Sequence, residues 1–281
     1  MARNERNSLF KSPSWPARIG RMLLMFCVLG TATAMIFENQ LIYHPSREGF
    51  YGGDHGFPVQ YVTFTADDGV RLSGAFCPVE HARGAIMWCH GNGGNLSYGF
   101  DAAGQFRKLG VSVFLFDYRG YGKSEGSPNG NGVMLDAEAA YQYVTQNLNV
   151  PPSHLVILGE SLGGAPAIRL ASRHQCAALI TQSTFTSIRD MAAVQFPYFP
   201  WLRFLVRTNF PNAEDIARVR APKLLIHSRT DEVVPFWMGE KLFAAANQPK
   251  EMWVIDRAAH NETFGLPGYL DHLRTFLDRV L

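Results

Sequence analysis

The sequence predicts an α/β fold, with a mostly parallel sheet of eight strands and helices on both faces of the sheet. Short, largely apolar runs alternate with longer segments of helical periodicity, as expected for strands that are buried on both faces. A hairpin precedes these runs, because residues 59–65 and 70–77 read as strands on either side of the turn Asp67-Asp68-Gly69. The 281 residues are enough for one large domain of this kind.

The elements follow one another in a regular order. The six runs predicted as parallel strands are residues 84–89, 111–116, 155–159, 178–182, 223–227 and 251–255. Helical periodicity is predicted over residues 96–109, 133–148, 162–173, 236–246 and 269–281. Residues 185–221 interrupt this alternation, since they are longer than an ordinary crossover and rich in aromatic side chains. They form either part of the core or a small lid whose apolar inner side lines a pocket or touches lipid.

The N-terminus differs from the rest of the chain. Residues 1–21 carry five of the 26 positive charges and one of the 24 negative charges, so the remainder is close to −2. We expect this basic segment to remain in the cytoplasm, by the positive-inside rule. The apolar residues 22–37 cover about 24 Å as a helix, and they form either an uncleaved signal-anchor, which we favour, or a signal peptide cleaved after Ala34.

In both interpretations residues 38–281 form the folded domain and lie on the extracytoplasmic side of a membrane. With the signal-anchor the protein is a single-pass membrane protein, and after cleavage it is secreted or periplasmic. The domain shows no clustered basic face, which argues against a nucleic-acid partner. The sequence leaves the oligomeric state open.

The cysteines do not form a recognisable framework. Cys27 lies in the apolar segment, so Cys77, Cys89 and Cys176 can form at most one disulfide within the domain. No Cys-x-x-Cys pair or Cys/His ligand spacing is present. We therefore predict no metal and no cofactor.

A glycine-flanked serine is the most informative local feature. Residues 159–164, Gly-Glu-Ser-Leu-Gly-Gly, follow a predicted strand and begin a predicted helix, and this context lifts the serine hydroxyl clear of the sheet. Serine needs a neighbouring base, held in turn by an acid, to act as a nucleophile. Asp231 and His260 each follow one of the last two predicted strands, so their loops meet at the same sheet edge. The sequence therefore predicts Ser161, Asp231 and His260 as a catalytic triad.

Other residues compete for these roles. Glu232 and Asp256 are alternative acids, but we expect Glu232 to point away from the site, and Asp256 is too close to His260 in one loop to orient its ring. His90 and His227 also lie near strand ends. As single histidines, we interpret both as structural.

Two backbone amides are candidates for the oxyanion hole of an acyl transfer. Residues 90–95, His-Gly-Asn-Gly-Gly-Asn, follow a predicted strand and place the amide of Asn92 near the sheet edge. The amide of Leu162 lies at the start of the helix after Ser161. A phosphate-binding loop is the alternative interpretation of these glycines, but the spacings typical of such loops are absent.

Taken together, these segments resemble the α/β-hydrolase superfamily, and within it the membrane-anchored serine hydrolases with a short lid. The resemblance covers nearly the whole chain after residue 38 and is carried by residues 41–45, 90–95, 116–126, 159–164, 183–187, 231–235 and 260–261. It implies the α/β-hydrolase fold, with Ser161 as nucleophile, Asp231 as acid, His260 as base and the amides of Asn92 and Leu162 as oxyanion donors. It also implies that residues 117–122 form a structural turn near the site.

Two positions depart from the family pattern. Pro166 lies one turn into the helix after the serine and removes a backbone N–H, which we expect to bend this helix while leaving the Leu162 amide free. Ser228-Arg229 replaces a glycine that often follows the strand before the acid, so we expect a differently shaped acid loop.

We expect a serine esterase or thioesterase that cleaves small acyl or lipid-like esters through an acyl-enzyme intermediate. A peptidase or amidase is the first alternative, although residues 185–210 offer only Asp190 for binding a free amino terminus. A non-catalytic, membrane-anchored binding protein is the second alternative. The presence of all three triad residues argues against it.

Overall fold

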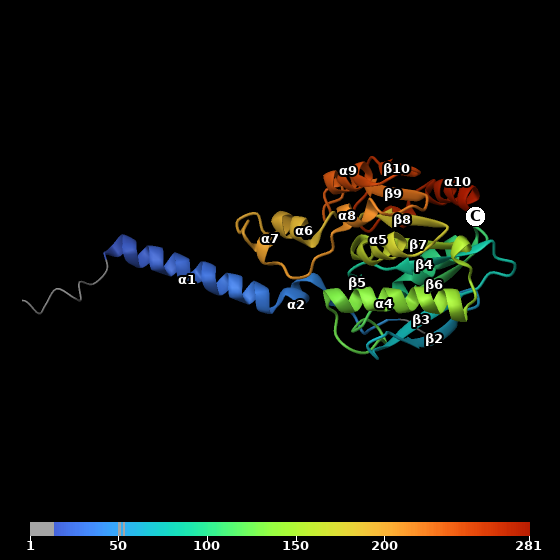
Figure 1. The fold of residues 1–281 in the computed structure, drawn as a ribbon, viewed down its shortest axis with the longest axis horizontal. Helices are drawn as coiled ribbons and strands as arrows, with labels where there is room; N and C mark the ends of the chain where they lie inside the picture. The colour runs from blue at the N-terminus through green and yellow to red at the C-terminus, as the bar shows by residue number, and fades with distance from the viewer. Residues whose placement is uncertain (1–13, 50–51, 53) are drawn as a thin grey trace, which may run out of the picture.

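The central sheet of the protein has eight strands and helices on both faces (Figure 1). The computed structural model describes residues 14–49, 52 and 54–281. The strands are β2 (Gln60–Thr65), β3 (Arg71–Cys77), β4 (Gly84–Cys89), β6 (Val111–Phe116), β7 (Leu155–Glu160), β8 (Ala178–Gln182), β9 (Lys223–Ser228) and β10 (Lys250–Ile255). Their order across the sheet is β10-β9-β8-β7-β4-β6-β3-β2.

The sheet has the predicted mixture of strand directions. β2 pairs antiparallel with β3, and β3 pairs antiparallel with β6. All other neighbours are parallel, so β4, β6, β7, β8, β9 and β10 end at the same edge. Every residue of β4 and β6 is buried, which explains the unbroken apolar runs in the sequence. The α/β-hydrolase fold and the eight strands are thus confirmed, and each strand begins and ends within one residue of its prediction.

Helices cover the two faces of the sheet and create two separate apolar cores. On one face lie α4 (Gly130–Gln142), α5 (Gly164–Arg173) and α9 (Phe236–Ala245). On the other face lie α3 (Phe100–Arg107) and α10 (Tyr269–Val280). The short 3-10 segments are η1 (Leu96–Gly99), η3 (Pro152–His154), η4 (Ser161–Gly163) and η5 (Thr263–Gly265), and the π-helical turn η2 (Tyr143–Asn147) continues α4. All four cysteines are free thiols.

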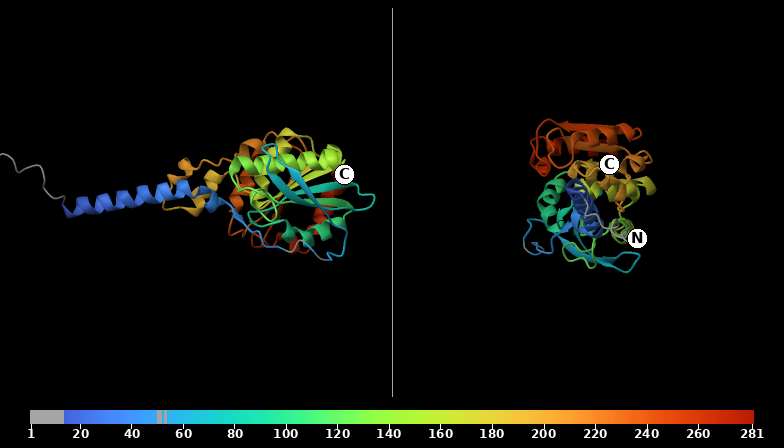
Figure 2. Two further views of the ribbon diagram at one scale, coloured as in Figure 1. Left: turned by 90° about the horizontal axis from the view of Figure 1, so that it is seen from below. Right: turned by 90° about the vertical axis from the view of Figure 1, so that its left-hand side faces the viewer.

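A long N-terminal helix extends away from this domain (Figures 1 and 2). Helix α1 (Trp15–Ile36) has 22 residues, none of which is buried, and it is long and apolar enough to cross a membrane. It includes Arg18 and Arg21, so it is longer than the apolar run of residues 22–37 and covers about 33 Å. The predicted basic positions Arg3, Arg6 and Lys11 lie outside the described residues.

The aromatic segment after β8 leaves the sheet and lies beside the long helix. It contains α6 (Ile188–Gln195), α7 (Leu202–Leu205) and α8 (Asn212–Ile216), and α7 contacts α1 (Figure 2). Tyr198 is 87% exposed and Phe204 is 75% exposed, whereas Phe210 is buried. The interpretation of this segment as core is therefore wrong for its central part and correct for its end.

A small second sheet joins two of the sequence motifs. After α2 (Glu38–Ile42), the two residues of β1 (His44–Pro45) pair parallel with β5 (Gly93–Gly94). The side chain of Asn95 reinforces this pairing by donating to the carbonyl oxygens of Ser46 and Glu48. The sequence indicated both motifs but not their contact.

Candidate active site

Ser161 lies on a sharp turn between β7 and α5. Its φ is +50°, a left-handed conformation that L-residues rarely adopt, and the crowded neighbourhood holds it there. A Cβ on Gly163 would lie 2.0 Å from the carbonyl oxygen of Cys89, and a Cβ on Gly159 would lie 2.5 Å from the Gly163 carbonyl oxygen. Only glycine fits at these two positions, so the turn can approach β4 closely and raise the hydroxyl above the sheet.

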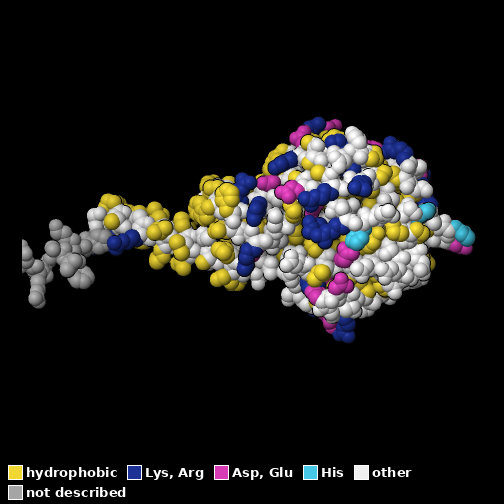
Figure 3. Space-filling view, in the orientation of Figure 1, with side chains coloured by type: hydrophobic (Ala, Val, Ile, Leu, Met, Phe, Trp, Pro, Cys, Tyr) yellow, Lys and Arg dark blue, Asp and Glu magenta, His cyan; other side chains and the backbone are white. Residues whose placement is uncertain are grey.

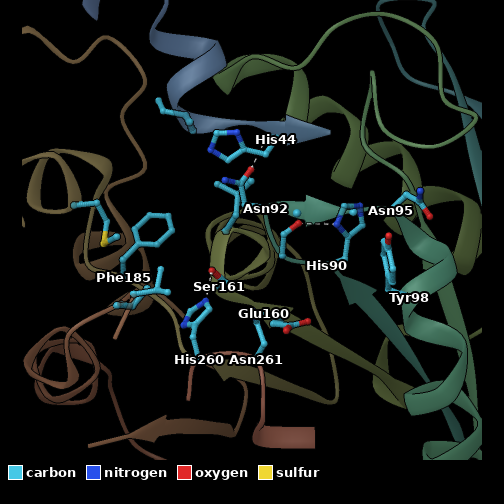
Figure 4. Close-up of a pocket in the computed structure, with 18 of the residues that line it drawn as sticks. His44, His90, Asn92, Asn95, Tyr98, Glu160, Ser161, Phe185, His260 and Asn261 are labelled. Atoms are coloured by element: carbon cyan, nitrogen blue, oxygen red, sulfur yellow. Dashed lines mark hydrogen bonds between the residues drawn. The ribbon is translucent and has the colours of Figure 1, made fainter. Parts of the chain in front are cut away.

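The three predicted triad residues meet at the carboxyl edge of the sheet. His260 Nε2 lies 2.9 Å from Ser161 Oγ (Figure 4). His260 Nδ1 lies 2.9 Å and 2.8 Å from the two carboxylate oxygens of Asp231. A carboxylate only accepts hydrogen bonds, so Nδ1 carries the ring proton of the neutral imidazole. Nε2 is then free to accept the hydrogen bond of the serine hydroxyl. These contacts join loops that are separated by up to 99 residues.

Asp231 is buried but remains an acceptor. Its Oδ1 also receives hydrogen bonds from the backbone N–H groups of Val233 (2.9 Å) and Val234 (2.8 Å). Burial raises the pKa of Asp231, but the hydrogen bonds from His260 and from the two backbone amides outweigh it, so its pKa lies below the ordinary value. The ionised carboxylate can therefore orient the imidazole and stabilise its protonated form.

The alternative acids and histidines considered from the sequence do not contact Ser161 or the ring of His260 through the hydrogen bonds described here. Glu232, which we expected to point away from the site, accepts a hydrogen bond from the backbone N–H of His260 at 3.0 Å. It therefore supports the histidine loop without touching the ring. The side chain of Asp256 is 97% exposed. His227 Nε2 bonds the carbonyl of Val234, and His90 Nδ1 bonds the carbonyl of Gly91, so both rings have structural contacts.

Ser228 contributes a contact that the sequence did not predict. Its hydroxyl donates to the carbonyl oxygen of Ala258 at 2.8 Å and accepts from the N–H of Ala258 at 3.0 Å. Ser228 thereby ties the end of β9 to the loop that carries His260. The sequence marks this position only as a departure from the glycine of the family pattern. No local pattern reveals a hydrogen bond between residues that are 30 positions apart.

The loop that carries the Asn92 amide is held from two sides. The side-chain oxygen of Asn92 accepts hydrogen bonds from Tyr121 Oη (3.1 Å) and from the backbone N–H of His44 (3.0 Å). Tyr118, in the predicted structural turn, donates to the carbonyl oxygen of His90. The Leu162 amide lies in η4, at the positive end of the helical segment that continues into α5. The Asn92 amide thus lies in the loop after β4, and the Leu162 amide directly follows Ser161 in η4.

A second carboxyl group, which is partly buried, lies next to the serine. Glu160 lines the cavity in front of Ser161, and burial raises its pKa to about 7, although the nearby His260 acts in the opposite direction. Figure 4 shows its side chain directed away from Phe185, toward the side of Tyr98. Glu160 was visible in the 159–164 motif, but nothing in the sequence indicated its burial.

The hydroxyl of Ser161 opens into a cavity of about 1100 Å³. This volume is at the upper end of the range for small-molecule sites, and most of the lining is apolar. The walls come from the ends of the parallel strands, from α2, α6 and α7, and from the last turns of α1. Over residues 14–49, 52 and 54–281, no three His, Cys, Asp or Glu side chains are grouped so as to hold a metal ion.

Comparison with known proteins identifies the family. The sequence model of the family described as alpha/beta hydrolase fold matches residues 84–214. The alpha/beta hydrolase domain-containing protein WAV2 of Arabidopsis thaliana is 31% identical over 78% of this chain and 79% of its own length. The chain belongs to the α/β-hydrolase family.

One further relative and one solved structure are also similar to this chain. An uncharacterized membrane protein of Saccharomyces cerevisiae is 29% identical to this α/β hydrolase over 91% of the chain and 94% of its own length. The esterase Pf2001 of Pyrococcus furiosus superimposes with a TM-score of 0.72 at 23% identity, covering 84% of this chain and 99% of the esterase. This second likeness shows the shared fold.

The proline of the helix that follows Ser161 lies in the first turn of α5 in this α/β hydrolase. Helix α5 begins at Gly164, two residues later than predicted, so Pro166 is its third residue. N–H groups in the first turn of a helix have no partner within the helix, and a proline there removes no hydrogen bond.

Proposed function

We propose that this α/β hydrolase is a serine esterase or thioesterase that cleaves acyl or lipid-like esters through an acyl-enzyme. The observation that carries the proposal is the continuous hydrogen-bond chain from Ser161 Oγ through His260 to Asp231, open to a large apolar cavity. Serine chemistry requires this base and acid arrangement, and apolar walls suit an acyl chain better than a charged substrate.

The geometry supports a two-step reaction. Ser161 Oγ attacks the acyl carbonyl carbon while His260 Nε2 takes the hydroxyl proton, and Asp231 stabilises the imidazolium. The N–H groups of Asn92 and Leu162 donate to the oxyanion. As the intermediate collapses, His260 returns the proton to the leaving alcohol or thiol. Water, deprotonated by His260, then attacks the acyl carbonyl carbon. The bond to Ser161 Oγ breaks, His260 returns the proton to Ser161 Oγ, and the carboxylic acid leaves.

A covalent label tests the nucleophile. A fluorophosphonate probe should label the full-length protein and the Ser153→Ala variant, in which an exposed serine far from the site is removed. The Ser161→Ala variant should remain unlabelled and lose at least about 10³-fold in kcat for p-nitrophenyl butyrate. Equal labelling of Ser161→Ala would remove Ser161 from this role.

A peptidase or amidase is the alternative, and Asp190 is the residue that bears on it. Its carboxylate accepts from Thr186 and forms ion pairs with Arg203 (3.3 Å) and Lys241 (3.6 Å). A carboxylate with these partners is not available for a substrate amino terminus. Aminoacyl-nitroanilides should therefore be cleaved more slowly than p-nitrophenyl esters, and the opposite preference would favour the peptidase.

We further propose that α1 is an uncleaved anchor, with the domain on the extracytoplasmic side. Its length of about 33 Å suffices for a bilayer, and Arg18 and Arg21 lie at the end that would remain in the cytoplasm. The protein should stay in the membrane fraction after alkaline extraction and should be digested by protease added from the extracytoplasmic side. Release of a shortened chain would indicate cleavage instead.

A further inference from the structure

The membrane-facing helix forms part of the cavity wall. Ala34 and Met35, in the last turn of α1, line the cavity together with Leu41 and Ile42 of α2. The wall is completed by apolar side chains of α6 and α7 and of the residue that follows each helix, which are Ile188, Met191, Phe196, Leu202, Leu205 and Val206. A helix that served only as a tether would not need to line the cavity that contains Ser161.

Polar contacts hold α1 and α2 against the α6–α7 segment. Trp201 Nε1 donates to Thr31 Oγ1 at 3.1 Å. The buried carboxylate of Glu38 accepts from the backbone N–H groups of Arg207 (3.1 Å) and Thr208 (2.7 Å) and forms an ion pair with the Arg207 guanidinium. The Arg207 side chain also donates to the carbonyl of Met35. The cavity wall is therefore fixed at both ends of the α7 region.

The outer surface of the same region is apolar and exposed. Figure 3 shows hydrophobic side chains along α1 and on the neighbouring α6–α7 segment. Tyr198 and Phe204 of this segment are exposed. Thr31, which contacts Trp201, lies five residues before the end of α1 at Ile36, and this spacing corresponds to about 7.5 Å along the helix. If α1 spans a bilayer, the aromatic side chains lie at interfacial depth, where Trp and Tyr are enriched.

The cavity extends to both sides of Ser161. Toward α6 and α7 lie Phe185 and the apolar wall. On the other side Figure 4 shows Glu160, Asn95 and Tyr98, and the lining there also includes the apolar side chains of Trp88 and Phe264. An ester bound with its carbonyl at Ser161 would have its acyl chain toward α6 and α7, next to the membrane, and its alcohol on the side of Glu160. A lipid already has this orientation in a bilayer leaflet.

We infer that the substrate is a long-chain acyl ester resident in the bilayer, and that the last turns of α1 form part of its acyl-binding site. The chain enters between α1–α2 and α6–α7, and the headgroup or alcohol occupies the side of Glu160. This inference rests on the proposed esterase activity and adds the substrate class and the route of entry.

A chain-length comparison in membranes tests it. Full-length protein in vesicles of phosphatidylcholine and phosphatidylglycerol is assayed with 4-methylumbelliferyl palmitate and butyrate. In Met35→Trp a larger side chain enters the apolar wall, so kcat/KM for the palmitate ester should fall at least tenfold more than kcat/KM for the butyrate ester. Leu41→Trp, on the neighbouring wall, should have the same selective effect.

The matched control is Leu29→Trp, which places the same side chain on an exposed position of α1 outside the cavity. It should leave both esters unchanged. The inference is overturned if Met35→Trp and Leu41→Trp leave palmitate hydrolysis unaffected, or if they lower both esters equally. Failure of the proposed activity itself looks different, because butyrate hydrolysis would then survive in Ser161→Ala.

Discussion

The two ends of the cavity are held together in different ways. At the reacting end, backbone atoms and buried hydrogen bonds leave little freedom, because Gly163 packs directly on the end of β4 and Asp231 receives three separate donors. At the end next to α1, the contacts are a few polar bonds between otherwise apolar segments, and Tyr198 and Phe204 remain exposed.

This difference fits the function that we propose for each end. Positioning a nucleophile requires a geometry fixed to fractions of an ångström, which close backbone packing provides. Admitting an acyl chain, as we propose, requires an apolar surface between segments that are joined by a small number of polar contacts.

The largest expected effect is at the turn that carries Ser161. A methyl group at residue 163 would lie 2.0 Å from the Cys89 carbonyl oxygen and 2.5 Å from that of His90, and backbone atoms of β4 cannot move aside. We expect Gly163→Ala to lower the free energy of unfolding by about 4 kcal/mol or more and to abolish fluorophosphonate labelling. Thermal unfolding in detergent and gel-based labelling measure both effects.

Gly30→Ala in α1 is the control at the other end, because no atom lies within 4 Å of the added methyl group. It should retain wild-type labelling and thermal stability. If Gly163→Ala changed stability and labelling as little as Gly30→Ala does, the turn that carries Ser161 would not be tightly packed, and the two ends of the cavity would not differ in the way described.

An intermediate effect concerns Glu160 and pH. The pKa of its partly buried carboxyl group is raised from 4.5 to about 7, so between these pH values the folded protein holds a proton that the unfolded protein has lost. This contribution to stability is present below about pH 4.5 and is lost as the pH rises through about 7. It amounts to about 3 kcal/mol.

Glu160→Gln removes this titration. When the pH is raised from 5 to 8, the wild type loses the contribution of Glu160 and the variant does not. The midpoint of thermal unfolding of the variant should therefore rise by roughly 5–10 °C relative to that of the wild type. Glu240→Gln, at an exposed position of α9, should shift in parallel with the wild type. A parallel shift of Glu160→Gln as well would show that Glu160 is not buried as described.

The smallest effect is expected at the contact between α1 and α7. Thr31→Val keeps the shape of the side chain but removes the acceptor for Trp201, which changes stability by about 1 kcal/mol. We expect hydrolysis of the palmitate ester to fall two- to threefold, with the butyrate ester unchanged. Thr33→Val, on the exposed side of α1, should change neither rate, and an equal loss in both variants would argue against the contact.

Prediction from the sequence was most accurate where the signal is local. The strands were predicted within one residue, because an apolar run between turns has few other interpretations. The loops of Ser161, Asp231 and His260 were predicted to meet, since parallel strands end at one edge, and they do meet. Their catalytic roles remain our proposal.

The supporting contacts could not be predicted in this way. Ser228 bonds the loop of His260, Glu232 bonds its backbone, and Glu160 lies partly buried next to Ser161. Each is a small polar or charged residue in a loop or at a strand end, where sequence pattern does not specify the partner. Their roles depend on which distant backbone atom lies nearby.

By itself, the sequence determined the order of the strands and helices, the turn that presents Ser161, and the apolar character of α1, because each depends on neighbouring residues and on the period of their side chains. Only the tertiary structure decided that residues 44–45 pair with residues 93–94 and that Trp201 meets Thr31 across 170 positions of the chain. The reason is physical: apolar and aromatic segments gain similar free energy against a protein core, another helix or a lipid, so their composition does not determine which one they contact.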